Sequence, residues 1–190
     1  MRTDIVLRPE TRRDDPEIAA LIRRSFSEGT DYSDGASEVA LVEDIRASAY
    51  YIPELSFVAE LDGKPVGHFM FSRFPLSPTR EGGHSGAGDT PIVMLAPVSV
   101  HADYLRQGVG SAMLWQGIER ARQAGFKGIT VEGNFRFYNQ LGFRTSSEFG
   151  IYPTSGIPLR EPRCMMCQET YPGSQKGIGG YVVYDMYQNA

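Results

Sequence analysis

The residues with the clearest chemical meaning form a short glycine-containing segment near the middle of the chain. Residues 106–111 (RQGVGS) follow an apolar stretch, Ile92–Val100, and stand at the start of a helical pattern. Glycine lets backbone amides approach a ligand closely because no Cβ intervenes. The first amides of a helix lack an intrahelical acceptor and lie at the positive end of the helix dipole. The segment therefore predicts a site for an anion, most often a phosphate.

Two common phosphate-binding motifs do not fit this segment. A dinucleotide-binding turn requires G-x-G-x-x-G, and Met113 stands at the third glycine position. A P-loop ends in Gly-Lys-Ser or Gly-Lys-Thr, whereas no lysine occurs between Val93 and Gln123. From this segment alone, a glycine turn that only connects a strand to a helix remains an alternative.

A third motif does fit, and a second segment supports it. Residues 106–111 resemble the pyrophosphate loop of acyl-CoA-dependent N-acyltransferases, whose pattern is Arg/Gln-x-x-Gly-x-Gly/Ala, with glutamine at the second position. Downstream, Phe137–Phe143 (FYNQLGF) resembles the F-Y-x-x-L-G-F signature of the GNAT superfamily. One helix and one strand are expected between the two motifs, as in that family. The chain is therefore similar to GNAT N-acetyltransferases over roughly Ile5 to Phe143.

The resemblance implies an α+β fold with a mixed, mostly antiparallel, central sheet and helices on both faces. In this family the strand before the glycine loop separates from its parallel neighbour, and the pantetheine arm of acetyl-CoA pairs with the exposed amides. Pro97 removes one amide donor there, which suits a strand that breaks its pairing. An N–H near Val98 should polarise the thioester carbonyl. The residues that the resemblance assigns to acetyl-CoA are Val98, Ser99, Val100, Arg106, Gln107, Gly108, Val109, Gly110, Ser111 and Asn134. Asn134 lies closer to Tyr138 than the N-x-x-A-x-x-x-Y spacing that is common in the family.

Tyr138 is the catalytic residue that the resemblance implies. After an amine attacks the thioester, the departing thiolate needs a proton, and a phenol within hydrogen-bond distance can donate it. Packing of the ring against the sheet is the alternative role. The group that takes a proton from the amine is not marked, and the candidates are Glu132, His68 and His101. Each has a structural alternative, as a surface charge, a sheet residue and a loop residue respectively.

The predicted function is transfer of an acetyl group from acetyl-CoA to the primary amine of a small molecule or peptide. Direct attack without a covalent enzyme intermediate is expected, because no cysteine lies in the predicted cofactor strand or loop. The alternative is a non-catalytic acyl-CoA-binding sensor or interaction domain of the same fold. Replacement of Tyr138 by phenylalanine would separate the two, because an enzyme should lose turnover and still bind CoA.

Composition restricts the other function classes. The net charge of −4 argues against a nucleic-acid partner, which usually selects a basic surface. No apolar run approaches the roughly 18 residues of a membrane helix, so we expect a cytoplasmic protein. Cys164 and Cys167 lack the second pair of ligands that a structural zinc site needs, and the three histidines are scattered. We therefore expect no metal and two thiols in a strand, and a homodimer is left open.

The length of the chain, together with the lack of an internal repeat or of a linker that would divide it, predicts one domain over residues 1–190. The acceptor side is expected to vary within 150–190, and Tyr32, Tyr50 and Tyr51 could line an acceptor pocket or pack the core. The expected elements are a strand Ile5–Pro9, a helix capped by Asp14 or Asp15, a helix around Val39–Ile45, a hairpin of Leu55–Leu61 and Pro65–Phe74, a strand Ile92–Val100, a helix ending at Gly125, a strand Gly128–Glu132, a short helix Asn134–Leu141, a strand Cys164–Gln168 that completes the sheet and an edge strand Tyr181–Tyr187.

Overall fold

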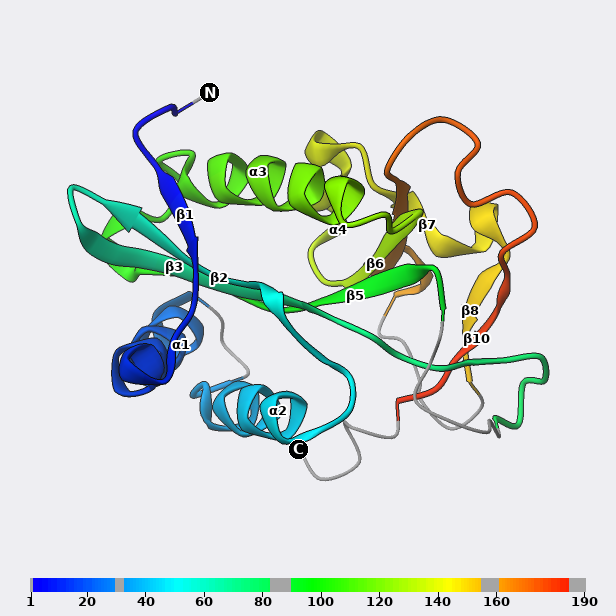
Figure 1. The fold of residues 1–190 in the computed structure, drawn as a ribbon, viewed down its shortest axis with the longest axis horizontal. Coiled ribbons are helices and arrows are strands. Elements are labelled where there is room, and N and C mark those ends of the chain that lie inside the picture. Colours follow the sequence, from blue (N-terminus) through cyan, green and yellow to red (C-terminus); the bar gives the residue numbers. More distant parts are fainter. Residues whose placement is uncertain (1, 30–32, 83–89, 155–160, 185–190) are drawn as a thin grey trace.

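The computed structural model describes residues 2–29, 33–82, 90–154 and 161–184. A seven-stranded sheet forms the centre of the fold, with the strand order β1-β2-β3-β5-β6-β9-β7 (Figure 1). Neighbouring strands run antiparallel except β5 and β6, which run parallel. The strands are β1 (Val6–Pro9), β2 (Tyr51–Leu61), β3 (Lys64–Ser72), β5 (Ile92–Val100), β6 (Gly128–Glu132), β7 (Arg144–Thr145) and β9 (Met165–Glu169).

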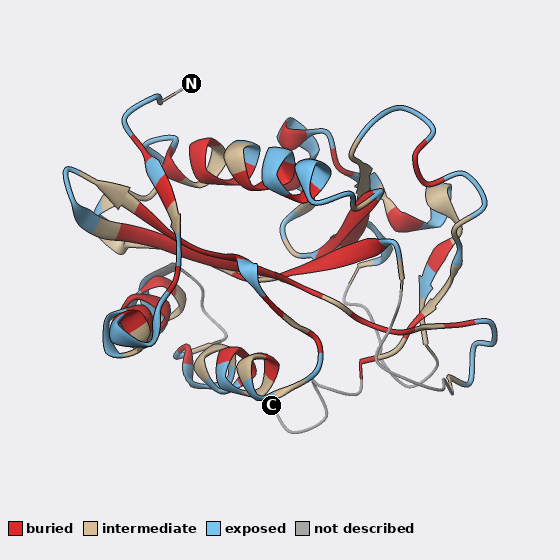
Figure 2. Ribbon diagram, viewed as in Figure 1, coloured by how far each residue is buried: buried red, intermediate tan, exposed pale blue. Residues whose placement is uncertain are grey.

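Helices cover both faces of this sheet (Figure 1). α1 (Asp15–Gly29) and α2 (Ala36–Ala47) lie on one face, and α3 (Val109–Gln123) lies on the other. The buried sides of the helices face the strands (Figure 2), which leaves a core on each side of the sheet. The predicted α+β fold, with a mixed, mostly antiparallel sheet and helices on both faces, is confirmed.

The helix α1 begins differently from the prediction. A 3-10 turn, η1 (Arg12–Asp14), precedes α1, so Asp14 belongs to that turn and Asp15 is the first residue of the helix. The Asp14 carboxylate accepts hydrogen bonds from the Arg8 guanidinium at 2.8 Å and from the Thr11 amide at 2.7 Å. These contacts, with Arg8 the stronger, lower the pKa of Asp14 to about 2.

The parallel strands β5 and β6 separate after a short paired stretch. Their register pairs Ile92 with Gly128 and ends where Met94 meets Thr130. Beyond that point β5 continues beside β3 alone, and β6 continues beside β9. The pairing of β5 with β3 is also irregular between Leu95 and Val98, the segment of β5 that holds Pro97. The predicted separation of these two strands is therefore present, and it opens the sheet between them.

The C-terminal third differs from the prediction at one strand. β9 lies between β6 and β7, so the predicted Cys164–Gln168 strand does complete the sheet. The predicted edge strand Tyr181–Tyr187 is wrong in its placement, because β10 (Gly180–Val182) joins a separate three-stranded sheet with β4 (Leu76–Ser77) and β8 (Ile151–Pro153). Tyr187 lies outside the described residues. The remaining short elements are α4 (Phe135–Tyr138), η2 (Ala102–Tyr104), η3 (Asn139–Leu141), η4 (Ser146–Phe149) and η5 (Pro162–Cys164).

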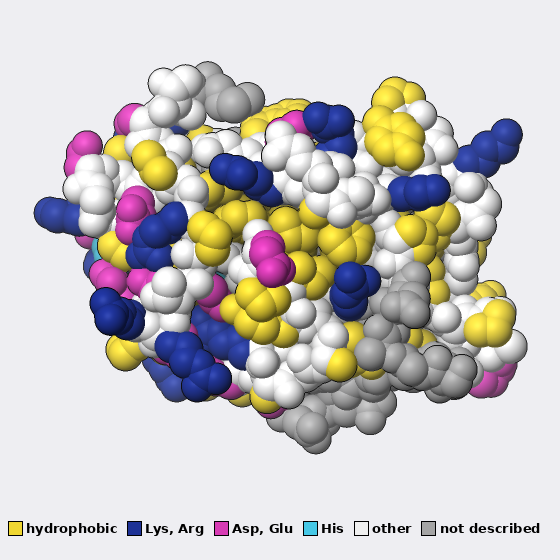
Figure 3. All heavy atoms as spheres, viewed as in Figure 1, with side chains coloured by type: hydrophobic (Ala, Val, Ile, Leu, Met, Phe, Trp, Pro, Cys, Tyr) yellow, Lys and Arg dark blue, Asp and Glu magenta, His cyan; other side chains and the backbone are white. Residues whose placement is uncertain are grey.

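The surface in Figure 3 carries acidic and basic side chains interspersed over the end that holds α1. Hydrophobic side chains gather on the same face between α3 and the layer formed by α1 and α2. Among the described residues, no helix combines the length and the hydrophobicity that a membrane crossing requires.

Candidate active site

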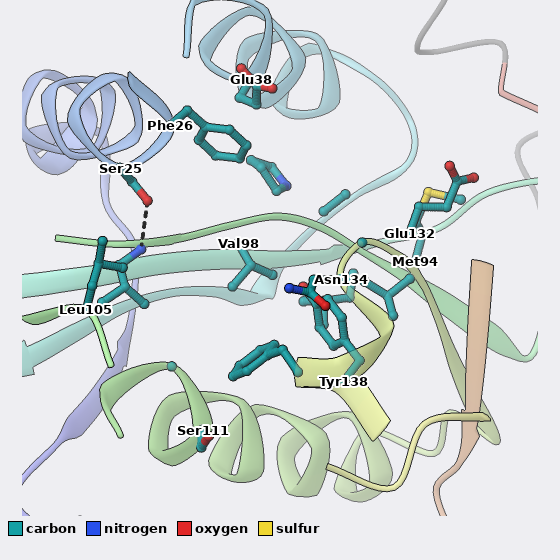
Figure 4. A pocket seen from close by; sticks show the side chains of 18 of the residues that line it. Ser25, Phe26, Glu38, Met94, Val98, Leu105, Ser111, Glu132, Asn134 and Tyr138 are labelled. Carbon is teal, nitrogen blue, oxygen red and sulfur yellow. Dashed lines mark hydrogen bonds between the residues drawn. The ribbon is translucent and has the colours of Figure 1, made fainter. Parts of the chain in front are cut away.

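A cavity of about 1030 Å³ lies where β5 and β6 separate. Leu105 and Ser111, at the glycine segment, form one end; Val98 and Tyr138 lie in the middle, and Glu132 lies at the opposite end (Figure 4). α1 and α2 close a further side. A long concave cavity with a few convergent polar groups is the usual form of a small-molecule site.

The two glycines of the loop serve different purposes. Gly108 is the N-cap of α3 with φ of +82°, a left-handed conformation that glycine adopts without strain. A Cβ at Gly110 would lie 3.3 Å from Cζ of Phe137, so glycine lets the loop approach the FYNQLGF segment. The N–H of Ala112 donates to the Gly108 carbonyl at 3.0 Å and begins the helical ladder. The amides before Ala112 therefore lie at the positive end of the helix, beside the cavity.

Two of the assigned loop residues do not line the cavity. The Gln107 side-chain amide donates to the Asp103 carbonyl at 2.6 Å, and Val109 is buried in the core. The motif assignment also needs a correction, because alignment on the two glycines puts its first position on Leu105 and makes Arg106 its second residue. The assigned loop residues that do line the cavity are Arg106, Gly108, Gly110 and Ser111.

The amides of β5 point alternately toward β3 and toward the cavity. The N–H of His101 donates to a carbonyl of β3 at 2.8 Å, and the N–H of Val100 donates to the Ser25 hydroxyl at 3.2 Å on the opposite side (Figure 4). Because successive strand residues direct their main-chain groups to opposite sides, the Ser99 amide points to β3 and the Val98 amide points to the cavity. Val98 and Val100 line the cavity, whereas Ser99 is buried outside it. Because the Val100 amide already donates to the Ser25 hydroxyl, the Val98 amide is the one best placed to donate to a ligand.

Tyr138 is held in place by its neighbours. Its ring is buried and meets Phe143 edge-on, with 5.5 Å between ring centroids. A Cβ at Gly133 would lie 2.7 Å from Cε2 of Tyr138, so glycine leaves room for the ring. Asn134 caps α4 by accepting the Arg136 N–H at 3.0 Å, and it also lines the cavity. The packing therefore fixes the phenol near the middle of the cavity (Figure 4).

Glu132 ends β6 at the part of the cavity remote from the glycine loop (Figure 4). Its carboxylate accepts a hydrogen bond from the Tyr184 hydroxyl. The side chain is exposed to the open cavity, yet protein surrounds it on most sides, and the resulting loss of hydration raises the pKa of Glu132 above its ordinary value. The bond from Tyr184 acts in the opposite direction and is the weaker effect.

His68 lies away from the cavity, in a buried cluster with Glu10, Arg46 and Tyr51. The Nε2 atom of His68 is 2.8 Å from Oε2 of Glu10. Glu10 also accepts hydrogen bonds from Arg46 at 2.9 and 3.0 Å and from the Tyr51 hydroxyl at 2.8 Å. Burial alone would raise the pKa of Glu10, but the bonds from His68 and Arg46 together hold it well below its ordinary value. His68 is therefore a structural partner of Glu10 and does not face the cavity.

The other candidate residues also lie elsewhere. His101 lines a separate cavity of about 370 Å³, where its Nε2 is 3.2 Å from Nη1 of Arg24. The Tyr51 hydroxyl donates a hydrogen bond to Glu10, and Tyr50 packs in the core under α2. Neither tyrosine lines the larger cavity. Tyr32 lies outside the described residues.

Several cavity residues were not recognised in the sequence. Phe26 of α1, Leu41 of α2 and Met94 of β5 line the cavity, but their spacing is that of ordinary core residues. Ser25 and Tyr184 come from distant segments, and no local motif marks either of them. Only contacts between elements identify these residues.

The cysteines show no feature of a reactive or metal-binding pair. Cys167 is buried in β9, and burial raises the pKa of its thiol to about 12, so it stays protonated at neutral pH. Cys164 ends the turn η5. Among the described residues, no three side chains of His, Cys, Asp or Glu gather as metal ligands.

Comparison with known proteins connects this geometry to a family. The profile of the Acetyltransferase (GNAT) family matches residues 17–143, which is more than half of the chain. The chain belongs to the GNAT acetyltransferase family. Membership confirms the predicted GNAT identity and makes the protein an acyl-CoA-dependent N-acetyltransferase.

Individual relatives agree with the family assignment. The uncharacterized N-acetyltransferase YjhQ of Escherichia coli strain K12 is 32% identical over 157 residues, which cover 81% of this chain and 80% of YjhQ. The E. coli protein YhbS, solved in complex with CoA, has the same fold with a TM-score of 0.79 and 24% identity, covering 98% of this chain and 93% of YhbS. A GNAT acetyltransferase from Brucella melitensis, solved with acetyl-CoA, gives a TM-score of 0.71 at 24% identity, covering 96% of this chain and 97% of that one.

Proposed function

We propose that this GNAT protein binds acetyl-CoA along the β5–β6 cavity and transfers its acetyl group to a primary amine of a small molecule or peptide. The observation that carries the proposal is the order of groups along one cavity. The glycine loop lies at one end, the Val98 amide and the Tyr138 phenol lie in the middle, and Glu132 lies beyond them (Figure 4). The CoA of YhbS and the acetyl-CoA of the Brucella protein support this class of ligand.

The residues present fit acetyl-CoA at its charged end and at its reactive end. The first amides of α3 and the nearby Arg106 would hold the pyrophosphate. The Val98 amide would donate to the thioester carbonyl oxygen and stabilise the negative charge that develops there. When bound, acetyl-CoA supplies the carbonyl carbon that the amine attacks.

Tyr138 would act as the acid of the reaction. Tyr138 and Val98 both line the middle of the cavity, where the Tyr138 phenol could donate a proton to the departing sulfur. Direct attack by the amine is favoured, because no cysteine lines the cavity among the described residues. The proposal requires no metal. We further infer that residues 1–190 act as one domain, with 150–190 shaping the acceptor side, since Tyr184 reaches the cavity.

Release of free thiol from acetyl-CoA tests the proposal. The assay uses 2-phenylethylamine, spermidine and a peptide with a free N-terminus as acceptors. At least one should be acetylated, and Tyr138→Phe should lower kcat by about 100-fold while the Kd for acetyl-CoA is unchanged. Tyr171→Phe, at a phenol that is 51% exposed, is the matched control. Binding of acetyl-CoA without turnover of any acceptor would instead favour a sensor.

A further inference from the structure

The C-terminal segment brings a buried tyrosine into the cavity. Tyr184 lies two residues beyond β10, is 6% exposed and lines the cavity. Its hydroxyl donates to Oε1 of Glu132, which is 52 residues away in the sequence, and lies 3.8 Å from Sδ of Met165. A segment outside the glycine and FYNQLGF motifs therefore fixes the carboxylate at one end of the cavity.

The surroundings of Glu132 contain few charges. Its partner across the sheet is Met165 of β9, which is buried and apolar. The other titratable side chains that line the cavity are Glu38 from α2, Tyr104 and Arg106 from the segment before α3, and Tyr138 from α4. No ion pair to Glu132 is present among the described residues, so its carboxylate can receive a cation without displacing one.

The lining also restricts the acceptor. Phe26, Leu41 and Met94 give the cavity apolar walls on the side of α1 and α2 and beside Glu132. An ammonium group would meet the Glu132 carboxylate, while the rest of the acceptor would contact these apolar side chains. A primary amine on an apolar body satisfies both conditions.

We propose that Glu132 takes a proton from a primary amine carried on an apolar body, and that Tyr184 is the positioning residue that holds the Glu132 carboxylate in place. This inference rests on the proposed acetyltransferase function, and it adds the proton acceptor and the class of acceptor amine.

The protons balance over the reaction. The Glu132 carboxylate takes one proton from the ammonium group and leaves a neutral amine with a free electron pair. That pair forms the bond to the acetyl carbon as the carbon–sulfur bond breaks, and Tyr138 donates its proton to the sulfur. The second proton of the nitrogen then restores Tyr138. Glu132 returns its own proton to solvent, so one proton is released for each acetyl group transferred.

The environment of Glu132 suits this role. Loss of hydration raises the pKa of Glu132 and brings it nearer to neutral pH, where a proton acceptor is more effective. Tyr184 limits the increase by donating to the ionised form. Loss of the Tyr184 hydroxyl should therefore raise the pKa of Glu132 further, which a purely structural tyrosine would not do.

The positioning role is tested without any ligand. ¹³C NMR titration of glutamate carboxyls gives the pKa of Glu132, whose signal is assigned by its loss in Glu132→Gln. Tyr184→Phe should raise this pKa by about one unit, as expected for loss of a hydrogen bond to a carboxylate. Tyr181→Phe, at a ring that packs at a tilt against Tyr152 instead, should leave this pKa unchanged. An unchanged pKa in Tyr184→Phe overturns the positioning role.

The catalytic role is tested with acetyl-CoA and 2-phenylethylamine. The acidic limb of kcat/KM should follow the pKa measured by NMR and move to higher pH in Tyr184→Phe. Glu132→Gln should lower kcat/KM by about 100-fold and keep the melting-temperature rise with acetyl-CoA. A decrease in kcat/KM of less than about threefold in Glu132→Gln would overturn the role of Glu132 as proton acceptor. If the wild-type protein binds acetyl-CoA but does not acetylate 2-phenylethylamine, the proposal that the acceptor is an amine on an apolar body is overturned. Failure to bind acetyl-CoA refutes the proposed function itself, while the NMR comparison still decides the pairing of Glu132 with Tyr184.

Discussion

Replacement of Glu10 by glutamine should destabilise the fold strongly without touching the cavity. The Glu10 side chain is 2% exposed and accepts hydrogen bonds from Arg46, Tyr51 and His68. It thereby connects the segment after β1 with α2, β2 and β3. Glutamine keeps the size of the side chain but removes the charge. The Arg46 guanidinium, which is 13% exposed, then loses its buried counterion and keeps only the more exposed carboxylates of Asp15 and Glu43.

The expected loss is about 3–5 kcal/mol, the range for removing one partner of a buried ion pair. In a chain of 190 residues this corresponds to a melting temperature lower by about 6–20 °C. The glutamine amide can still accept one hydrogen bond, so the lower half of the range is the better expectation.

The destabilisation should also depend on pH. The folded-state pKa of Glu10 lies well below the ordinary value of 4.5, so its carboxylate stabilises the native state above that pH. This contribution is lost progressively as the pH falls below about 4.5 toward the folded-state pKa. The difference between wild type and Glu10→Gln should therefore be full at pH 7 and shrink at low pH.

Urea unfolding at pH 7 and at pH 4 measures both effects. Glu119→Gln, in an exposed pair with Arg122 on the surface of α3, is the matched control and should show no measurable change. A difference of less than about 1 kcal/mol for Glu10→Gln at pH 7, or one that grows at low pH, would refute the assignment of Glu10 as a buried charged centre.

Two further predictions concern the core. Gly117→Ala should destabilise α3 against the sheet by about 1–2 kcal/mol, because the new Cβ would lie 2.5 Å from Cε2 and Cζ of the buried Phe69, and the strain exceeds the gain in helix propensity. Urea unfolding measures this change, and an unchanged or increased free energy of unfolding would contradict the close packing of α3 against Phe69. Cys167 should resist Ellman's reagent in the native protein at pH 8, since burial raises its pKa to about 12. Two thiols that react at once without denaturant would contradict its burial.

The sequence predicts the features of this protein that depend on local signals. The glycine turn, the start of α3 and the hairpin formed by β2 and β3 follow from residue types at fixed spacing, and each is present. The separation of β5 from β6 was implied by family resemblance and is also present. The cofactor roles of the assigned residues remain predictions.

Contacts between distant segments could not be predicted. Glu132 and Tyr184 are 52 residues apart, and Glu10 and His68 are 58 residues apart, so no local pattern marks either pair. For the same reason His68 was a candidate base, although in the structure it is a hydrogen-bond partner of the buried Glu10 carboxylate. The strand near Tyr181 carried a strand pattern but no information on its partners, and it joined β4 and β8 in place of the main sheet.

Binding of acetyl-CoA at the glycine loop tests the account most directly. At a concentration of acetyl-CoA about 100 times Kd, wild-type protein should melt about 5–10 °C higher, because a ligand bound only by the folded state stabilises it by about 2.7 kcal/mol. Gly108→Asp should abolish this rise by placing a negative charge at the pyrophosphate position. Gly177→Asp is the matched control, because φ is +81° at Gly177 and +82° at Gly108, and a Cβ at Gly177 would have no atom within 4 Å. This variant should keep the rise in melting temperature. A rise that survives Gly108→Asp, or its absence in the folded wild-type protein at millimolar acetyl-CoA, would contradict the proposed site.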